Sequence, residues 1–301
     1  MSTELPDLYP GFETRIVDVK GMRLFSRIGG SGLPLLLLHG YPQSHVIWHK
    51  FAPELAKHFK LIMPDLPGYG NSSIPPIRTD YANYSKRAMA TAVLDMMRAL
   101  GHQEFYLAGH DRGGRVGYRL ALDHPEAVLK LAVLDILPTS DYWDRLDREF
   151  GLAVYHWMFL AQPFPFPEKM IAAAPIRFLE HTLAGWTAEK SLDCFTDEAL
   201  AHTRDWFCEP DRISATCEDY RAGATLDYEH DKTDREAGKT IKADLLALWG
   251  DKGIATKVDD PLAIWRTWCP HAQGAALSCG HFLPEEAPHE TCEALRRFFG
   301  S

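Results

Sequence analysis

The feature that most constrains the fold of this chain is an alternation of short apolar runs with longer segments of helical character. Such alternation is typical of a mostly parallel β-sheet with helices on both faces. The runs predicted to be strands are Pro34–Leu38, Leu61–Met63, Glu104–Ala108, Lys130–Leu134, Leu245–Trp249 and the less apolar Gln273–Leu277. Between them, Lys86–Leu100 is predicted to be a helix that ends at Gly101, since glycine commonly follows a helix C-terminus. The chain is therefore predicted to be an α/β protein.

Residues 138–243 interrupt this alternation. The interval is rich in Trp, Tyr, Phe, Pro and His, and it contains helical and loop-like segments but no clear strand. Ligands bind at the carboxyl ends of the strands in open α/β sheets, so an insertion at this point is predicted to cover the binding site. We therefore expect a first core segment (1–137), an inserted helical cap (138–243) and a second core segment (244–301).

The charge balance of the chain excludes some classes of partner. Its 301 residues carry a formal net charge of −9, whereas nucleic acid and anionic membranes bind basic surfaces. None of the six cysteines forms a C-x-x-C pair, and no apolar run approaches the ~20 residues of a membrane helix. The polar N-terminus lacks the pattern of a signal peptide. We expect a cytoplasmic protein with reduced cysteines that binds neither nucleic acid nor membrane.

A strand–turn–helix pattern surrounds Asp111. An apolar run leads into Gly109-His110-Asp111-Arg112-Gly113, and a helical pattern follows over Arg115–Asp123. This is the context of a nucleophile elbow, whose usual G-x-S-x-G here has aspartate in place of serine. A carboxylate that attacks a saturated carbon forms an ester, which water can cleave, whereas serine would form a stable ether. The elbow predicts halide displacement or epoxide opening; the alternative is a solvated aspartate that caps the helix.

His281 is the candidate general base, because it lies on a loop near the C-terminus where chains with a nucleophile elbow place their histidine. Two aspartates compete to orient it. Asp135 follows one predicted strand, and Asp251 follows the next. The loop that contains Asp251 often reads W-G-x-x-D, but Gly253 occupies the acidic position in this chain. This favours Asp135.

The positions of two arginines predict an anion site beside the nucleophile. Arg112 and Arg115 lie one and four residues after Asp111, and a helical side chain leans back toward the helix N-terminus. Both guanidinium groups are therefore expected to bind a substrate carboxylate, the alternative being that either pairs with a neighbouring acid. The backbone N–H groups of Tyr41 and Arg112 are the candidate donors of an oxyanion hole.

The predicted cap contains donors that suit a departing halide. His156 and Trp157 supply an imidazole and an indole N–H, and Tyr220 supplies a phenol O–H. Taken alone, an aromatic residue is more often part of a core than of a catalytic site, so both interpretations stay open on the residues alone.

Together these motifs resemble the fluoroacetate dehalogenases of the α/β-hydrolase superfamily over essentially the full length of the chain. The matching segments are HGYPQSHVIWH from His39, DLPGYG from Asp65, GHDRGGRVGYRLALDHP from Gly109, LAVLDILPT from Leu131, YHWMFLAQP from Tyr155, CEDYRAGA from Cys217 and GHFLPEEAP from Gly280. The resemblance implies the α/β-hydrolase fold. It also implies a nucleophile, base and orienting acid (Asp111, His281, Asp135), a carboxylate site (Arg112, Arg115), a halide site (His156, Trp157, Tyr220) and Trp186 near the substrate passage. Tyr41 is a departure, since phenylalanine is common at its position.

The expected activity is the hydrolysis of fluoroacetate to glycolate and fluoride through a covalent ester on Asp111, without cofactor or metal. The resemblance alone implies a homodimer. A dehalogenase that prefers chloro- or bromoacetate is the nearest alternative. An epoxide hydrolase is the next, although a neutral epoxide would leave the two arginines without an anion to bind. A non-catalytic binding protein of this fold is an alternative from a different class.

Overall fold

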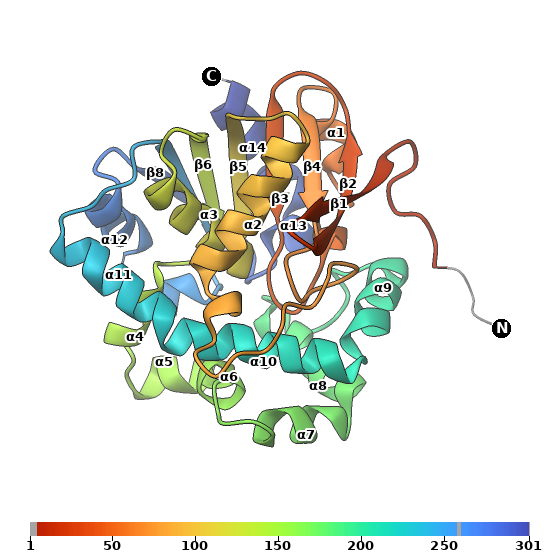
Figure 1. The fold of residues 1–301 in the computed structure, drawn as a ribbon, viewed down its shortest axis with the longest axis vertical. Coiled ribbons are helices and arrows are strands. Elements are labelled where there is room, and N and C mark those ends of the chain that lie inside the picture. The colour runs from red at the N-terminus through yellow and green to blue at the C-terminus, as the bar shows by residue number, and fades with distance from the viewer. Residues whose placement is uncertain (1–4, 258–259, 301) are drawn as a thin grey trace.

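The computed structural model describes residues 5–257 and 260–300, and an eight-stranded sheet forms its centre (Figure 1). The strand order is β1-β2-β4-β3-β5-β6-β7-β8. The strands are β1 (Glu13–Val19), β2 (Met22–Gly29), β3 (Pro34–Leu38), β4 (Lys60–Pro64), β5 (Phe105–His110), β6 (Val128–Leu134), β7 (Asp244–Gly250) and β8 (Gln273–Leu277). β2 is antiparallel to both β1 and β4, and all other neighbouring strands are parallel. The predicted α/β class is confirmed, and each predicted strand is present.

The hairpin of β1 and β2 was not identified from the sequence. β1 is exposed along most of its length, and only alternate residues of β2 are buried. The exposed positions of these two strands leave no continuous apolar run of the kind by which buried parallel strands are found. The sequence pattern therefore located the six strands β3 to β8 but not this hairpin.

The sheet separates two apolar cores. Successive residues of β3 point to opposite faces, so that Leu36 and Leu38 belong to one core while Leu35 and Leu37 belong to the other. The helices that flank the sheet are α1 (Ala52–Leu55), α2 (Lys86–Ala99), α3 (Arg112–Asp123), α12 (Pro261–Trp268), α13 (Leu283–Glu286) and α14 (Pro288–Gly300), with short 3₁₀ turns η1 (His45–Trp48), η2 (Ala82–Tyr84) and η3 (Ala255–Lys257). α2, α3 and α12 supply buried residues to the first core, and α1 and α14 supply them to the second.

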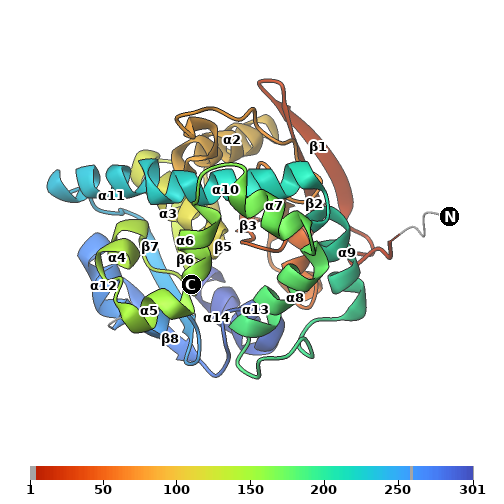
Figure 2. The same cartoon turned by 90° about the horizontal axis from the view of Figure 1, so that it is seen from below.

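Eight helices lie between β6 and β7. They are α4 (Thr139–Asp144), α5 (Arg148–Ala153), α6 (Tyr155–Leu160), α7 (Phe166–Ala172), α8 (Pro175–Trp186), α9 (Asp197–Phe207), α10 (Pro210–Ala224) and α11 (Leu226–Glu236). Most of them form a layer beside one end of the sheet in Figure 1, and Figure 2 shows them spread across that end. They fall in the interval predicted to be a cap, although the three-part division of the chain stays a prediction. No helix in the described residues is long and apolar enough to cross a membrane.

Candidate active site

Asp111 lies at a sharp turn between β5 and α3. Its backbone has φ 46° and ψ −119°, a conformation that a non-glycine residue adopts only when its surroundings enforce it. Two glycines permit the close approach of the chain: a Cβ atom at Gly40 would overlap the Asp111 side chain, and one at Gly113 would overlap the backbone of Leu38 and His39. Asp111 is only 7% exposed, and its side chain makes no capping bond to α3. The alternative of a solvated capping aspartate is therefore wrong.

The surroundings of Asp111 keep its carboxylate ionised. Burial raises the pKa of Asp111, but electrostatic interactions with His281, His110, Arg112 and Arg115 outweigh it and lower the pKa from 3.8. The Tyr41 N–H donates to Asp111 Oδ1 at 2.8 Å, as an oxyanion donor would. The N–H of Arg112, the second predicted donor, makes no hydrogen bond to Asp111 within the described residues.

His281 faces Asp111 across a short gap. Its Nε2 lies 3.8 Å from Asp111 Oδ2 and has no hydrogen-bond partner within the described residues, while its Nδ1 lies 2.6 Å from Asp135 Oδ2. Burial lowers the pKa of His281, but the hydrogen bond and negative charge of Asp135, together with the charge of Asp111, raise it above 6.5. The arrangement is that of a base with an orienting acid on one nitrogen and a free nitrogen toward the nucleophile.

The structure places Asp135, rather than Asp251, beside His281. Asp135 follows β6 and also accepts the N–H group of Gly250 (3.2 Å), the last residue of β7, and that of Ile254 (3.1 Å) in the loop that follows. Gly253 faces the same carboxylate, and a Cβ atom at this position would overlap Asp135 Oδ1. Gly253 stands at the acidic position of the W-G-x-x-D pattern, and the space beside it is filled by Asp135, which follows the neighbouring strand β6.

The side chain of Arg112 already has an acidic partner. Its Nε and Nη2 donate to the two carboxylate oxygens of Asp219 at 3.0 and 2.7 Å, and Nη2 also donates to the Asp219 carbonyl at 2.8 Å. Asp219 lies on α10, is fully buried, and also contacts Lys86 and the Tyr69 hydroxyl. Burial raises the pKa of Asp219, but the charges of Arg112 and Lys86 outweigh it and lower the pKa well below 3.8. Sequence reasoning missed this pair, because Asp219 is 107 positions away and was noted only within the CEDYRAGA segment.

Arg115 differs from Arg112 because it makes no ion pair with a carboxylate in the described part of the chain. Its Nη1 donates to the Leu137 carbonyl and to Thr139 Oγ1, both at 3.0 Å, and its buried Nε has no partner. The guanidinium lies over the ring of Trp157, 4.5 Å from the centroid, and 4.9 Å from that of Tyr142. Arg115 therefore keeps a buried positive charge that is free to bind an anion beside Asp111.

The three predicted halide ligands lie together. The ring of Tyr220 is 5.7 Å from that of His156 and 6.3 Å from that of Trp157, and the Arg112 guanidinium lies 4.3 Å from the Tyr220 centroid. Tyr220 Oη and His156 Nδ1 are buried without a partner among the described residues. Burial and the charge of Asp111 raise the pKa of Tyr220 well above 10, and burial lowers the pKa of His156 to about 3. Both groups are therefore neutral at pH 7, and the Tyr220 hydroxyl is free to donate to an anion.

Trp186 lies between these residues and a surface cavity. Its ring is 4.3 Å from the His156 ring and 5.3 Å from the His281 ring. It also lines a cavity of about 220 Å³ together with Tyr155 and Thr182. The role of Trp186 near a substrate passage stays a prediction.

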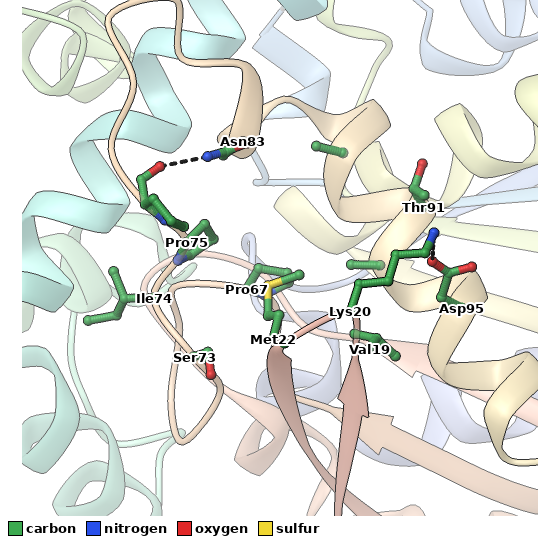
Figure 3. Close-up of a pocket in the computed structure, with 14 residues that line it drawn as sticks. Val19, Lys20, Met22, Pro67, Ser73, Ile74, Pro75, Asn83, Thr91 and Asp95 are labelled. Atoms are coloured by element: carbon green, nitrogen blue, oxygen red, sulfur yellow. Dashed lines mark hydrogen bonds and ion pairs between the residues drawn. The ribbon is translucent and has the colours of Figure 1, made fainter.

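A second cavity, of about 560 Å³, lies away from this cluster. Figure 3 shows it beside the turn between β1 and β2, where Lys20 pairs with Asp95 of α2 and where Pro67 and Ile74 contribute apolar surface. None of the predicted site residues lines it. The described residues also contain no group of three or more His, Cys, Asp or Glu arranged to hold a metal ion.

Comparisons with known proteins identify similar sequences and structures. Residues 34–288 match the family model described as the alpha/beta hydrolase fold. A fluoroacetate dehalogenase from Burkholderia sp is 43% identical over 97% of this chain and 95% of that protein. A structure from Nostoc sp PCC 7120, described as an alpha/beta hydrolase, is 49% identical, with a TM-score of 0.93 over 96% of this chain and 98% of that one. A structure from Pseudomonas aeruginosa, described as an epoxide hydrolase, is 42% identical, with a TM-score of 0.91 over 98% of this chain and 97% of that one.

Proposed function

Because this chain belongs to the fluoroacetate dehalogenase family of the α/β-hydrolase superfamily, we propose that this hydrolase removes the halide from a small haloacid, with fluoroacetate as its substrate. One observation carries the proposal. Asp111 is buried and faces the oriented His281, and the charge of Arg115, which has no acidic partner among the described residues, helps to lower the pKa of Asp111. An aspartate nucleophile suits displacement at a saturated carbon, and the arginine suits a substrate that is itself an anion.

In the first step, the carboxylate of Asp111 displaces the halide. Arg115, with the one guanidinium nitrogen of Arg112 that Asp219 does not engage, binds the substrate carboxylate and directs the α-carbon toward Asp111. One carboxylate oxygen forms the C–O bond as the carbon–halogen bond breaks, and the electron pair leaves with the halide. The unpartnered Tyr220 hydroxyl, with the N–H groups of His156 and Trp157, stabilises the departing anion. The products are free halide and a glycolyl ester on Asp111.

In the second step, His281 activates water. The free Nε2 removes a proton from a water molecule, whose oxygen attacks the ester carbonyl of Asp111. Asp135 stabilises the resulting imidazolium through Nδ1. The Tyr41 N–H, already bonded to Asp111 Oδ1, stabilises the negative oxygen of the tetrahedral intermediate. As the intermediate collapses, the ester C–O bond breaks and the imidazolium returns its proton to the departing glycolate oxygen. The remaining carboxyl proton is released to solvent, which regenerates the Asp111 carboxylate and neutral His281.

The test is halide release from purified protein given fluoroacetate and chloroacetate in separate incubations. Ion chromatography follows each halide, and an Asp111→Asn variant serves as the control. We expect fluoride and chloride from the wild type and neither from the variant. Chloride without fluoride would support the chloro- or bromoacetate alternative and overturn fluoroacetate as the substrate.

The epoxide hydrolase alternative is favoured by the similarity to the Pseudomonas aeruginosa structure. An epoxide would be opened by the same aspartate, but its neutral charge would leave the Arg115 guanidinium buried without an anion. Diol formation from epoxides without halide release would favour this alternative. Tight binding of haloacids without turnover would instead favour a binding protein.

The implied homodimer is a separate proposal, which light scattering on the purified protein would test.

A further inference from the structure

The carboxylate of Glu286 accepts three backbone hydrogen bonds around the proposed base. Its Oε1 accepts from Phe282 N–H at 2.9 Å, and its Oε2 accepts from Gly280 N–H at 2.9 Å and from Ala188 N–H at 2.7 Å. Phe282 and Gly280 are the two chain neighbours of His281, whereas Ala188 follows α8 in the helical layer between β6 and β7. One charged group thus holds the backbone on both sides of His281 and joins it to a second segment of the chain.

The segment from Trp186 to Ala188 packs directly on the backbone of the base loop. The His281 N–H donates to the Trp186 carbonyl at 2.9 Å. There is no room for a side chain at Gly280, because a Cβ atom there would overlap Ala188 N and would lie 2.6 Å from the Trp186 carbonyl oxygen. A glycine is therefore required beside the base, and glycine leaves the backbone free to adopt many conformations unless other contacts restrict it.

Other contacts hold His281 itself, and its N–H bond to the Trp186 carbonyl is one of them. Asp135 bonds the imidazole ring, and His110 Nε2 lies 2.8 Å from the His281 carbonyl oxygen. Within the described residues, Glu286 is the side chain that bonds both neighbours of His281. Glu286 adds to these contacts by fixing the backbone on both sides of His281, without touching the imidazole ring.

We infer that Glu286 is a positioning residue that holds the backbone of His281 against the segment Trp186–Ala188, so that ester hydrolysis depends on it more than ester formation does. The inference rests on the proposed function, because it assigns Glu286 to the step in which His281 acts as a base. Halide displacement needs the carboxylate of Asp111 but no proton transfer to His281. Only the second step should slow when the imidazole loses its alignment.

The test compares Glu286→Gln with Glu290→Gln, a matched change at an exposed position of α14. The carboxamide has nearly the same shape, but its NH₂ group must face at least one of the three N–H donors. Rapid-quench experiments with fluoroacetate and chloroacetate measure halide release in the first and later turnovers, and mass spectrometry measures the ester on Asp111. For Glu286→Gln we expect first-turnover halide release at the wild-type rate, steady-state turnover reduced by about 10- to 100-fold, and accumulated ester.

The amount of halide released in the first turnover also gives the number of folded active sites, so partial unfolding of a variant would be recognised. Equal slowing of both steps in Glu286→Gln, or unchanged turnover, would overturn the inference. Glu290→Gln should behave as the wild type does. Accumulation of the ester in both variants alike would also overturn it.

A second readout needs no substrate. The Nδ1 proton in the bond from His281 to Asp135 should give a low-field NMR signal. We expect this signal to broaden through faster exchange with water in Glu286→Gln but not in Glu290→Gln. If the wild type releases no halide, the proposed function fails while this comparison still tests Glu286: a sharp, unchanged signal in Glu286→Gln would contradict its positioning role.

Discussion

Arg112 and Arg115 carry the same guanidinium group, but their surroundings give the two charges different roles. Arg112 is bonded on one edge to Asp219, whose charge is also shared with Lys86. Arg115 has only neutral partners among the described residues. A buried charge is costly unless an opposite charge compensates it, so Arg115 has the greater gain from binding a carboxylate. We therefore expect Arg115 to supply most of the attraction for substrate and Arg112 to supply direction.

The role of Asp219 can be tested by Asp219→Asn. The amide keeps one accepting oxygen, so the two-pronged bond to Arg112 is lost and the guanidinium can rotate. Hydrogen bonds to charged groups contribute roughly 1.5–3 kcal/mol, so KM for haloacetate should rise about tenfold or more while kcat changes less. Asp227→Asn is the control, because Asp227 contacts Lys86 but makes no hydrogen bond to Arg112. An unchanged KM in a folded Asp219→Asn protein would contradict the role.

The raised pKa of His281 predicts the pH dependence of ester hydrolysis. Burial lowers this pKa, but Asp135 and Asp111 raise it above 6.5, and the base acts only when deprotonated. In the ester Asp111 carries no charge, so Asp135 is the main group left to raise this pKa. Hydrolysis should therefore slow as the pH falls through the pKa of His281. Asp135→Asn removes the largest contribution that raises the pKa of His281, so the decline in the rate of hydrolysis should move to lower pH. The plateau rate should also fall, by up to about 10⁴-fold. Single-turnover pH–rate profiles measure both, and a decline at the same pH as in the wild type would count against the assignment. Asp251→Asn, at an exposed position, is the control.

At the scale of elements, the acid that orients His281 follows β6, whereas the W-G-x-x-D pattern would place it after β7. Both strands end at the same edge of the sheet, since they are parallel neighbours. An acid after either strand can therefore reach His281, but the overlap of a Cβ at Gly253 with Asp135 shows that both cannot occupy this space. Asp135 also accepts the N–H groups of Gly250 at the end of β7 and of Ile254 in the loop after it. It therefore both orients the base and holds this part of the chain.

This exclusion predicts a compensating pair of changes. Gly253→Asp alone should lower activity and stability, because its side chain would displace Asp135. Asp135→Ala alone should lower ester hydrolysis by about 10²- to 10⁴-fold. The double variant Asp135→Ala/Gly253→Asp should recover at least about tenfold of that loss, because the acid reaches His281 from the neighbouring strand. Steady-state kinetics of the three proteins form the measurement, and strict additivity of the two losses would refute the exchange.

At the scale of the whole molecule, buried charges join the helical layer to the sheet domain. Arg119 of α3 is 2% exposed and pairs with Asp231 at 2.9 Å and with Asp234, both on α11, as well as with Asp123 at 3.3 Å. Asp231 also accepts from the Tyr118 hydroxyl at 2.9 Å. The helix that leads back into β7 is thus held by an ion-pair network rather than by apolar packing alone.

Removal of the central cation of this network should destabilise the fold. Arg119→Met leaves Asp231 buried without its positive partner, and breaking such a pair typically costs about 3–5 kcal/mol. Arg204→Met removes a pair with Glu180 that is about one-third exposed, and should cost no more than about 1 kcal/mol. Urea unfolding followed by fluorescence gives the two free energies. Similar values for the two variants would show that the buried network does not stabilise the fold.

The sequence predicted the parts of the site that depend on local pattern. The elbow at Asp111, the histidine loop and six strands each occupy a short continuous segment, where apolar periodicity and glycine spacing specify the backbone directly. The weakly patterned hairpin of β1 and β2 could not be found in this way, because one of its faces is open to solvent. The resemblance to a known family added the cap residues, which local pattern leaves ambiguous.

What only the tertiary structure decided are the pairings between distant segments. The bond of Arg112 to Asp219 and the bond of Glu286 to the Ala188 N–H join residues whose separation in sequence gives no signal of contact. Hydrogen bonds and ion pairs act over a few ångströms, so they depend on how helices and strands pack rather than on which residues precede them. The sequence by itself determined the chemical groups and the local turns that present them; packing determined which charges are compensated and which remain free to act.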